Sequence, residues 1–155
     1  MHLILIRHAE RETLPQVADS QQVLTAKGLR TAKILGEYLL AINLPATTKF
    51  YSSDYLRATQ TAAQINTALG NKLQIQTKEC LRTDGDGDLP EILELVKANS
   101  QQDWVLLVGH KPELEQVGAY FTGRPLPLKK AEAASIAIPD TSNWIGRIEW
   151  RYHAK

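Results

Sequence analysis

Short apolar runs alternate with longer amphipathic stretches along the chain, and this alternation predicts its fold. Apolar runs rich in strand-forming residues predict buried strands at residues 2–6, 49–52 and 104–108, a weaker strand at 73–76 and two late strands at 134–138 and 146–152. Apolar residues at helical spacing predict helices at about 26–42, 54–69, 89–98 and 113–120. Strands that alternate with helices are typical of an α/β three-layer sandwich. We therefore expect a largely parallel central sheet with helices on both faces and an antiparallel edge formed by the late pair.

Capping residues indicate where two of these helices begin and end. Thr25 is the expected N-cap of the first, which Asn43 and Pro45 end. Ser53 or Asp54 is the expected N-cap of the second, and Gly70 its stop. The length of 155 residues, without repeats or linkers, fits a single domain over 1–155.

Overall charge and composition narrow the classes of function. Eighteen basic and seventeen acidic residues leave a net charge of +1, which gives no general electrostatic reason to expect binding to nucleic acid or an acidic membrane. The single cysteine, Cys80, cannot form an intramolecular disulfide and suits a reducing compartment. No apolar run approaches the roughly 18 residues of a membrane span. Because the first strand follows Met1 without a basic region, we expect a cytoplasmic protein; the sequence does not indicate its oligomeric state.

The most informative polar residues stand at the ends of three predicted strands. The first strand ends in Arg7 and His8, the second runs into a helix that carries Arg57, and the strand 104–108 ends at Gly109 and His110. Ligands of open α/β sheets bind at the carboxyl ends of the strands. If these three strands are neighbours, two arginines and two histidines share one rim, which predicts a site for a dianion.

Each of these residue types suits phosphoryl chemistry. Arginine carries a permanently charged planar fork, so Arg7 and Arg57 can neutralise a phosphoryl dianion and hold its oxygens. A neutral imidazole at His8 can attack phosphorus if a backbone carbonyl in the following loop fixes its other ring nitrogen. His110 can donate to the phosphoryl oxygens and stabilise the transition state.

The same segments resemble the histidine phosphatase superfamily. Residues 5–10, with Arg7 and His8, resemble its Arg-His-Gly signature; residues 52–62 resemble its second arginine motif, 108–110 its second histidine motif and 24–28 its Leu-Thr-x-x-Gly block. The compact chain, without a long insertion before Gly109, is similar to the SixA-type phosphohistidine phosphatases. The resemblance implies a phosphoglycerate mutase-like fold and hydrolysis of phosphohistidine on a histidine-containing phosphotransfer domain in signal transduction. It also implies a covalent intermediate at His8 and no metal or other cofactor.

Two positions depart from the family pattern. Ala9 replaces the usual glycine, which leaves the loop less free to adopt a positive φ, and we expect activity to be retained. Family members often carry an arginine just before the Leu-Thr block, where this chain has residues 21–23 as Gln-Gln-Val. One phosphate contact is therefore either missing or supplied by Arg11.

A general acid is less clearly marked. The candidates are Glu79, Asp84, Asp86 and Asp88, and we expect Asp84 or Asp86 to assist if any carboxylate does. Imidazole leaves more readily than an alkoxide, so a phosphohistidine substrate needs less help from an acid. The alternating aspartates of residues 83–88 resemble a calcium loop, but leucines occupy the positions that need glycine and glutamate, so a solvated turn is expected.

Other interpretations of these residues remain open at this point. The chain can be a phosphatase or mutase acting on a small phosphate ester, or a phosphoprotein-binding module that has lost turnover. Arg57 can simply pair with Asp54 three residues earlier. His2 and His153, at opposite ends of the chain, are expected to be structural or solvent-facing, and Cys80 to be a small buried hydrophobe.

Overall fold

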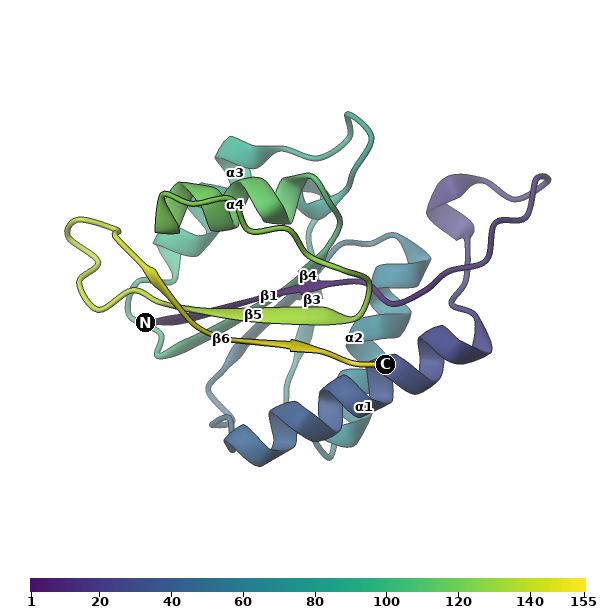
Figure 1. Cartoon of the computed structure of the whole chain (residues 1–155), viewed down its shortest axis with the longest axis horizontal. Helices are drawn as coiled ribbons and strands as arrows, with labels where there is room; N and C mark the ends of the chain where they lie inside the picture. The colour runs from purple at the N-terminus through teal and green to yellow at the C-terminus, as the bar shows by residue number, and fades with distance from the viewer.

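A computed structural model describes all 155 residues, with one six-stranded sheet between two layers of helices (Figure 1). The strands lie in the order β3-β2-β4-β1-β5-β6. Their bounds are β1 (His2–Arg7), β2 (Lys49–Ser52), β3 (Ile75–Thr77), β4 (Trp104–Gly109), β5 (Glu132–Ala137) and β6 (Arg147–His153). The first four run parallel, whereas β5 runs antiparallel to β1 and β6 antiparallel to β5. The predicted fold class, a largely parallel sheet with an antiparallel edge, is confirmed.

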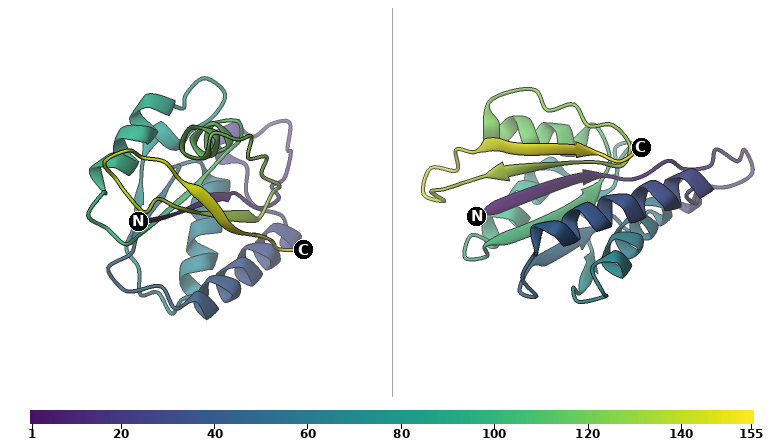
Figure 2. Two further views of the ribbon diagram at one scale, coloured as in Figure 1. Left: turned by 60° about the vertical axis from the view of Figure 1, so that its left-hand side comes forward. Right: turned by 60° about the horizontal axis from the view of Figure 1, so that its bottom comes forward.

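The helices cover the sheet in two pairs, one on each face (Figure 2). They are α1 (Ala26–Ile42), α2 (Leu56–Ala68), α3 (Leu89–Ala98) and α4 (Glu113–Thr122), with short 3-10 turns at η1 (Asp19–Gln21) and η2 (Glu79–Leu81). One apolar core lies between the sheet and α1 with α2, and the other between the sheet and α3 with α4. No helix has the combination of length and apolar character that crossing a membrane requires.

The central strand β1 shows why its sequence is an unbroken apolar run. Ile4 and Ile6 belong to the core beneath α1 and α2, and Leu3 and Leu5 belong to the core beneath α3 and α4. Successive side chains of a strand point to opposite faces, and both faces are covered here. A strand in this position has no solvent-facing side, so polar residues are confined to its ends.

The structure confirms the predicted ends of α1 and the Gly70 stop of α2, and it corrects the start of α2. Thr25 caps α1 by accepting the Gly28 N–H at 2.9 Å, and Asn43 closes the helix in a left-handed conformation. The expectation that Ser53 or Asp54 caps α2 is wrong, because Tyr55 is its N-cap and forms no side-chain cap.

Other bounds differ only slightly from the prediction. The strand β3 spans Ile75–Thr77 rather than 73–76, because Leu73 packs into the core beneath α1 and α2 instead of extending the sheet. The helix α4 continues to Thr122, and β5 begins at Glu132, two residues before the predicted start.

Candidate active site

Four residues singled out from the sequence line one polar pocket at the carboxyl edge of the sheet. The strand β4 lies between β1 and β2 and runs parallel to both, so the last residues of all three strands meet at one edge. Arg7, His8, Arg57 and His110 line a cavity of about 240 Å³ there. The other lining residues are Arg11, Thr83, Asp84, Lys111 and Lys130, and none of the nine is hydrophobic. The strand order thus brings together residues that lie up to about a hundred positions apart.

His8 is held in the neutral form and in one orientation. Its ring is 5% exposed, and Nδ1 lies 2.7 Å from the Ala9 carbonyl oxygen, to which it donates. Burial lowers the pKa of His8 to about 3 against the opposing effect of that hydrogen bond, and the charges of Arg57 and Arg7 lower it further. With the proton on Nδ1, the lone pair of Nε2 is available to an electrophile. The backbone carbonyl expected from the sequence is therefore that of Ala9.

Alanine fits at the position where the family usually has glycine. Ala9 does not adopt a positive φ, so its Cβ causes no backbone strain. Its N–H donates to Thr61 Oγ1 at 3.0 Å, and that hydroxyl donates to the Arg57 carbonyl at 2.7 Å. One threonine of α2 therefore ties the loop after His8 to the helix that carries Arg57.

Gly28 allows α1 to approach the same loop. A Cβ at this position would lie only 2.1 Å from the Glu10 carbonyl oxygen. That oxygen accepts the Thr25 N–H at 3.0 Å, so the first turn of α1 packs directly against the residues that follow His8. The Leu-Thr-x-x-Gly block is thus a packing motif that supports the pocket from outside.

Two of the pocket arginines, Arg7 and Arg57, are anchored and still have unused hydrogen-bond donors. Arg57, 3% exposed, donates to the Asp19 carbonyl at 2.7 Å and to its carboxylate at 3.1 Å, and Arg7 donates to the Leu128 carbonyl at 2.9 Å. The Nε atom of each is buried without a hydrogen-bond partner. A buried charged donor without an acceptor is costly. An anion bound between the two guanidinium groups would supply that acceptor.

The simpler interpretation, in which Arg57 pairs with Asp54, is wrong. Asp54 lies before the first turn of α2, and its carboxylate accepts from Arg82 at 2.8 Å. Arg57 instead pairs with Asp19, whose carboxylate also lies 3.5 Å from Arg11. Asp19 therefore orients two arginines of the pocket. Nothing in the sequence distinguished it, since it is one acidic residue within a polar stretch that carries no motif.

His110 is neutral as well, and the Ser53 hydroxyl lies within hydrogen-bond distance of one of its ring nitrogens. The ring is 2% exposed, and burial, followed by the neighbouring His8 and the arginines, lowers the pKa of His110 to about 2. Its Nε2 lies 2.9 Å from Ser53 Oγ, while Nδ1 is buried without a partner. Because Ser53 Oγ accepts the Tyr55 N–H at 3.2 Å, its own proton is free to be donated to Nε2. The imidazole proton then resides on Nδ1.

The carboxylates proposed as a general acid are spread over several places. Asp84 lines the pocket and is exposed. Asp86 accepts from the Tyr55 hydroxyl at 3.0 Å, and the Tyr55 ring lies 5.2 Å from that of His110. Asp88 caps α3, and Glu79 is an exposed neighbour of Arg82. Only Asp84 is therefore placed to reach a leaving group directly, and no group of three or more metal-ligating side chains is gathered anywhere in the structure.

The remaining titratable candidates lie outside this pocket. Cys80 is buried, and burial raises the pKa of its thiol to about 11, so it is a small buried side chain as expected. His2 lies at the opposite end of β1, 2.8 Å from a Glu149 carboxylate oxygen. His153 ends β6 and is half-buried.

Comparison with known proteins identifies the family. The family model of the histidine phosphatase superfamily (branch 1) matches residues 3–84, more than half of the chain, and the chain belongs to this superfamily. The matched region contains Arg7, His8 and Arg57, whereas His110 lies beyond it. No protein among the curated ones matches the sequence significantly.

Solved structures share the fold over nearly their whole length. The protein histidine phosphatase SixA complexed with tungstate is 22% identical with a TM-score of 0.86, covering 99% of this chain and 97% of that one. A provisionally assigned SixA from Agrobacterium tumefaciens is 20% identical with a TM-score of 0.83, covering 97% and 96%. A mycobacterial glucosyl-3-phosphoglycerate phosphatase is 17% identical with a TM-score of 0.77, covering 99% of both chains. These likenesses confirm the phosphoglycerate mutase-like fold.

Proposed function

We propose that this protein is a metal-independent phosphatase that hydrolyses phosphohistidine on a protein, such as a histidine-containing phosphotransfer domain. The observation that carries the proposal is the state of His8: a buried, neutral imidazole, fixed through Nδ1 by the Ala9 carbonyl, in a pocket lined by three guanidinium groups. Arg7 and Arg57 balance the charge of the phosphoryl group, which is the task that a metal ion performs in other phosphatases.

In the first step the Nε2 lone pair of His8 attacks phosphorus, and the bond from phosphorus to the substrate imidazole nitrogen breaks. The electron pair of that bond stays on the substrate nitrogen, which takes a proton from water or from Asp84. The His8 ring gains positive charge, and its Nδ1–H bond to the Ala9 carbonyl stabilises this charge.

In the second step water attacks the phosphorus of the phosphohistidine formed at His8. The bond from phosphorus to Nε2 breaks, and its electron pair returns to the ring, which becomes neutral. One proton of the attacking water passes to the solvent and the other stays on the inorganic phosphate that leaves. His110 donates through Nδ1 to a phosphoryl oxygen in both steps, while Arg7 and Arg57 hold the others. The unpartnered buried nitrogens of these three residues are the donors that this role requires.

The character of the pocket favours phosphohistidine over a bulky ester. A cavity of about 240 Å³ without a hydrophobic lining residue is smaller than the usual ligand pocket, and its polar lining suits a phosphoryl group better than a bulky organic group. Asp84 is exposed, and no hydrogen bond holds its side chain in place, so it is a weakly positioned general acid. An imidazole leaving group needs less protonation than an alkoxide, so phosphohistidine depends less on such an acid. Likeness to the two SixA structures supports the same choice.

A second candidate function is hydrolysis of a small phosphate ester. The mycobacterial glucosyl-3-phosphoglycerate phosphatase, which shares the fold, favours this alternative. A third candidate, a phosphoprotein-binding module without turnover, would be expected to lack one of the four pocket residues. All four are present in this chain.

One assay separates the three candidates. The protein is mixed with a phosphohistidine-bearing carrier domain and, separately, with a chromogenic phosphate ester, both in chelator. Release of phosphate from the carrier alone supports the proposal, and release from the ester alone supports the small-molecule phosphatase. Binding without release from either supports the module. Loss of turnover in chelator would contradict metal independence.

A labelling experiment tests the covalent step. With a ³²P-labelled carrier, rapid quenching in alkali should trap label on the wild-type protein, and mass spectrometry should place it on His8. The His8→Ala variant should carry no label, and label at any other residue would contradict the proposed intermediate.

A further inference from the structure

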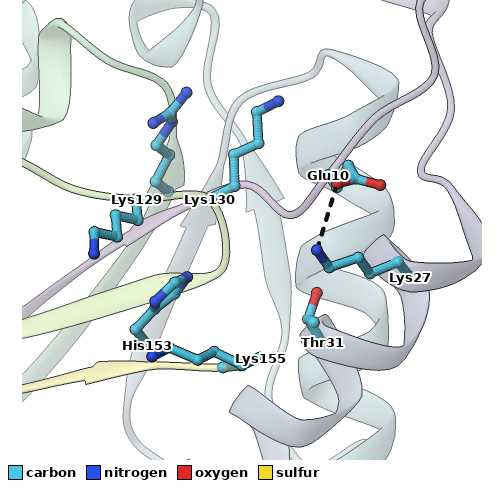
Figure 3. A pocket seen from close by; sticks show the side chains of 9 residues that line it. Glu10, Lys27, Thr31, Lys129, Lys130, His153 and Lys155 are labelled. Carbon is cyan, nitrogen blue, oxygen red and sulfur yellow. Dashed lines mark ion pairs between the residues drawn. The ribbon is translucent and has the colours of Figure 1, made fainter.

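A second and larger cavity adjoins the catalytic pocket. It has a volume of about 550 Å³ and shares the lining residues Arg7 and Lys130 with that pocket, so the two cavities are neighbours at these side chains. Its walls come from the loop after β1, the first turns of α1, the segment before β5 and the residues that end β6 (Figure 3). We refer to it as the basic cleft.

Positive charge dominates the basic cleft. Lys27, Lys129, Lys130 and Lys155 line it, and Glu10 is its only acidic side chain. Figure 3 shows Glu10 beside Lys27, with 3.9 Å between the carboxylate oxygen and the ammonium nitrogen. The chain as a whole carries a net charge of only +1, so this concentration of lysines is a local feature. Like charges gathered in one cavity raise the local concentration of anions there.

Lys27 has Glu10 as a counter-charge, but the other three lysines of the cleft have none within the protein. The ammonium groups of Lys129, Lys130 and Lys155 form no ion pair. An acidic residue does lie near: the Glu132 carboxylate accepts the backbone N–H of Lys129 at 2.8 Å. Its other oxygen accepts from Arg151 at 2.8 Å, so this carboxylate is already engaged. Repulsion among the lysines is therefore uncompensated unless an anion binds from outside.

We propose that the basic cleft binds acidic side chains that flank the phosphohistidine of a protein substrate. This inference rests on the proposed function and names the partner's chemistry. The lysine side chains are exposed, and each carries a compact charge at the end of a long flexible chain. Such side chains suit several separate carboxylates better than a single planar carboxylate held in a fixed geometry. Ala154 is the only hydrophobic lining residue and the cleft has no Phe, Tyr or Trp, so an apolar ligand finds little surface to bind; His153 is its one aromatic ring.

The shared side chains of Arg7 and Lys130 give this binding a consequence for catalysis. A chain whose phosphohistidine enters the catalytic pocket places its neighbouring residues over these two side chains. Carboxylates next to the phosphohistidine then meet Lys129 and Lys155. The cleft would thus act mainly on KM, because its ammonium groups lie outside the reacting atoms.

The test uses two synthetic peptides of equal length with one phosphohistidine each, flanked by glutamates in one and by glutamines in the other. Three proteins are compared: wild type, Lys129→Gln/Lys155→Gln, and the control Lys33→Gln/Lys49→Gln. The control removes the same charge from positions outside both cavities, since Lys33 lies midway along α1 and Lys49 begins β2 at its amino end. Lys130 is left unchanged because it also lines the catalytic pocket.

Wild type should prefer the glutamate peptide through a lower KM, and this preference should weaken as salt is raised. In Lys129→Gln/Lys155→Gln, kcat/KM for the glutamate peptide should fall by about five- to thirtyfold, the effect of two exposed charge pairs. Values for the glutamine peptide and for phosphoramidate, which reports the reacting centre alone, should change less than about twofold. The control should behave as wild type does at equal ionic strength.

Failure of the inference and failure of the proposed function give different results. If wild type hydrolyses both peptides equally well, or if the lysine variant still prefers the glutamate peptide, the basic cleft does not bind acidic residues of the substrate. The proposed phosphatase activity would be unaffected by that result. If neither peptide is hydrolysed while a chromogenic ester is, the proposed function itself is wrong. A small bisphosphate ester whose KM rises in the lysine variant as much as that of the glutamate peptide would overturn the choice of a protein ligand.

Discussion

The strand β1 has a histidine near each end, and the two lie in opposite surroundings. At the amino end the His2 side chain is 35% exposed, stacks on Trp104 with ring centroids 4.2 Å apart and bonds to the Glu149 carboxylate. Just beyond the carboxyl end, His8 is 5% exposed and faces two arginines. His2 thus bonds to a carboxylate, whereas His8 does not. The reactivity of a histidine here depends on which groups surround its ring as much as on the residue type.

Sheet topology produces this difference. The antiparallel strand β6 brings Glu149 to the edge of the sheet where β1 begins, so His2 has a carboxylate within reach. At the other edge three parallel strands end together and place His8 in a pocket with arginines and His110, where its ring bonds to the Ala9 carbonyl and not to a carboxylate. The acid nearest to the arginines, Asp19, is bound to Arg57 and Arg11.

The largest effect is expected from removing the reactive ring. His8→Ala should abolish turnover, because no other group supplies an electron pair to phosphorus at this position. It should still bind inorganic phosphate, since Arg7 and Arg57 remain. Turnover assays and calorimetric phosphate titrations measure the two properties separately. Near-normal turnover by the variant would rule out the covalent mechanism.

Arg57→Ala should lower kcat/KM by about 10²–10³, as expected for a preorganised donor that stabilises charge in the transition state. Arg7→Ala should have an effect of the same order. Arg57→Lys is the matched control: it keeps the charge but loses the planar fork bonded to Asp19, so it should restore only part of the rate. Full activity in Arg57→Lys would show that charge alone is sufficient.

Ser53→Ala should lower kcat by about ten- to a hundredfold through the tautomer of His110. Without the Ser53 hydroxyl, nothing donates to Nε2, and the proton no longer has to reside on Nδ1. Nitrogen NMR shifts of the His110 ring report the tautomer directly, and Ser53→Thr, which keeps a hydroxyl, should recover most of the rate. An unchanged tautomer together with a lowered rate would contradict this positioning role.

The pH dependence of stability should reflect the two buried imidazoles. Their folded pKa values, about 3 for His8 and about 2 for His110, lie below the unfolded value near 6.5, so between these limits the unfolded chain binds more protons. The contribution of the two neutral rings to the free energy of unfolding is complete above pH 6.5 and is lost as the pH falls toward 3. Between pH 7 and 5 this amounts to roughly 2 kcal/mol for one histidine.

Urea unfolding of wild type and of His8→Asn at pH 7 and at pH 5 measures how much of the loss of stability comes from His8. The variant should lose less stability on acidification than wild type, by the amount that His8 contributes. Equal losses in the two proteins would mean that the ring is already charged in the folded state near pH 6.5.

The smallest effect is expected at the other end of β1. His2→Gln removes a surface ion pair with Glu149 and should cost no more than about 1 kcal/mol of unfolding free energy. Turnover should be unchanged, because His2 lines neither the catalytic pocket nor the basic cleft. A large loss of activity in this variant would show that the two ends of the strand are coupled.

Local patterns predicted most of the elements and the chemistry of the strand ends. The unbroken apolar run of β1 indicated a strand covered on both faces, and Thr25 marked the start of α1. The cap of α2 was missed because Ser53 and Asp54, both good capping residues, bond elsewhere: Ser53 to His110, and Asp54 to Arg82. Residue type alone cannot tell which of several partners a side chain will meet.

By itself the sequence determined where strands and helices form and which side chains stand at the strand ends, because these follow from short-range periodicity and local propensity. The tertiary structure alone decided that Asp19 holds Arg57, 38 residues away, and that Lys27, Lys129 and Lys155 surround one cleft. Such contacts depend on strand order and helix packing, which bring distant segments together. A charged residue in a loop carries no local signal of what will face it once the chain has folded.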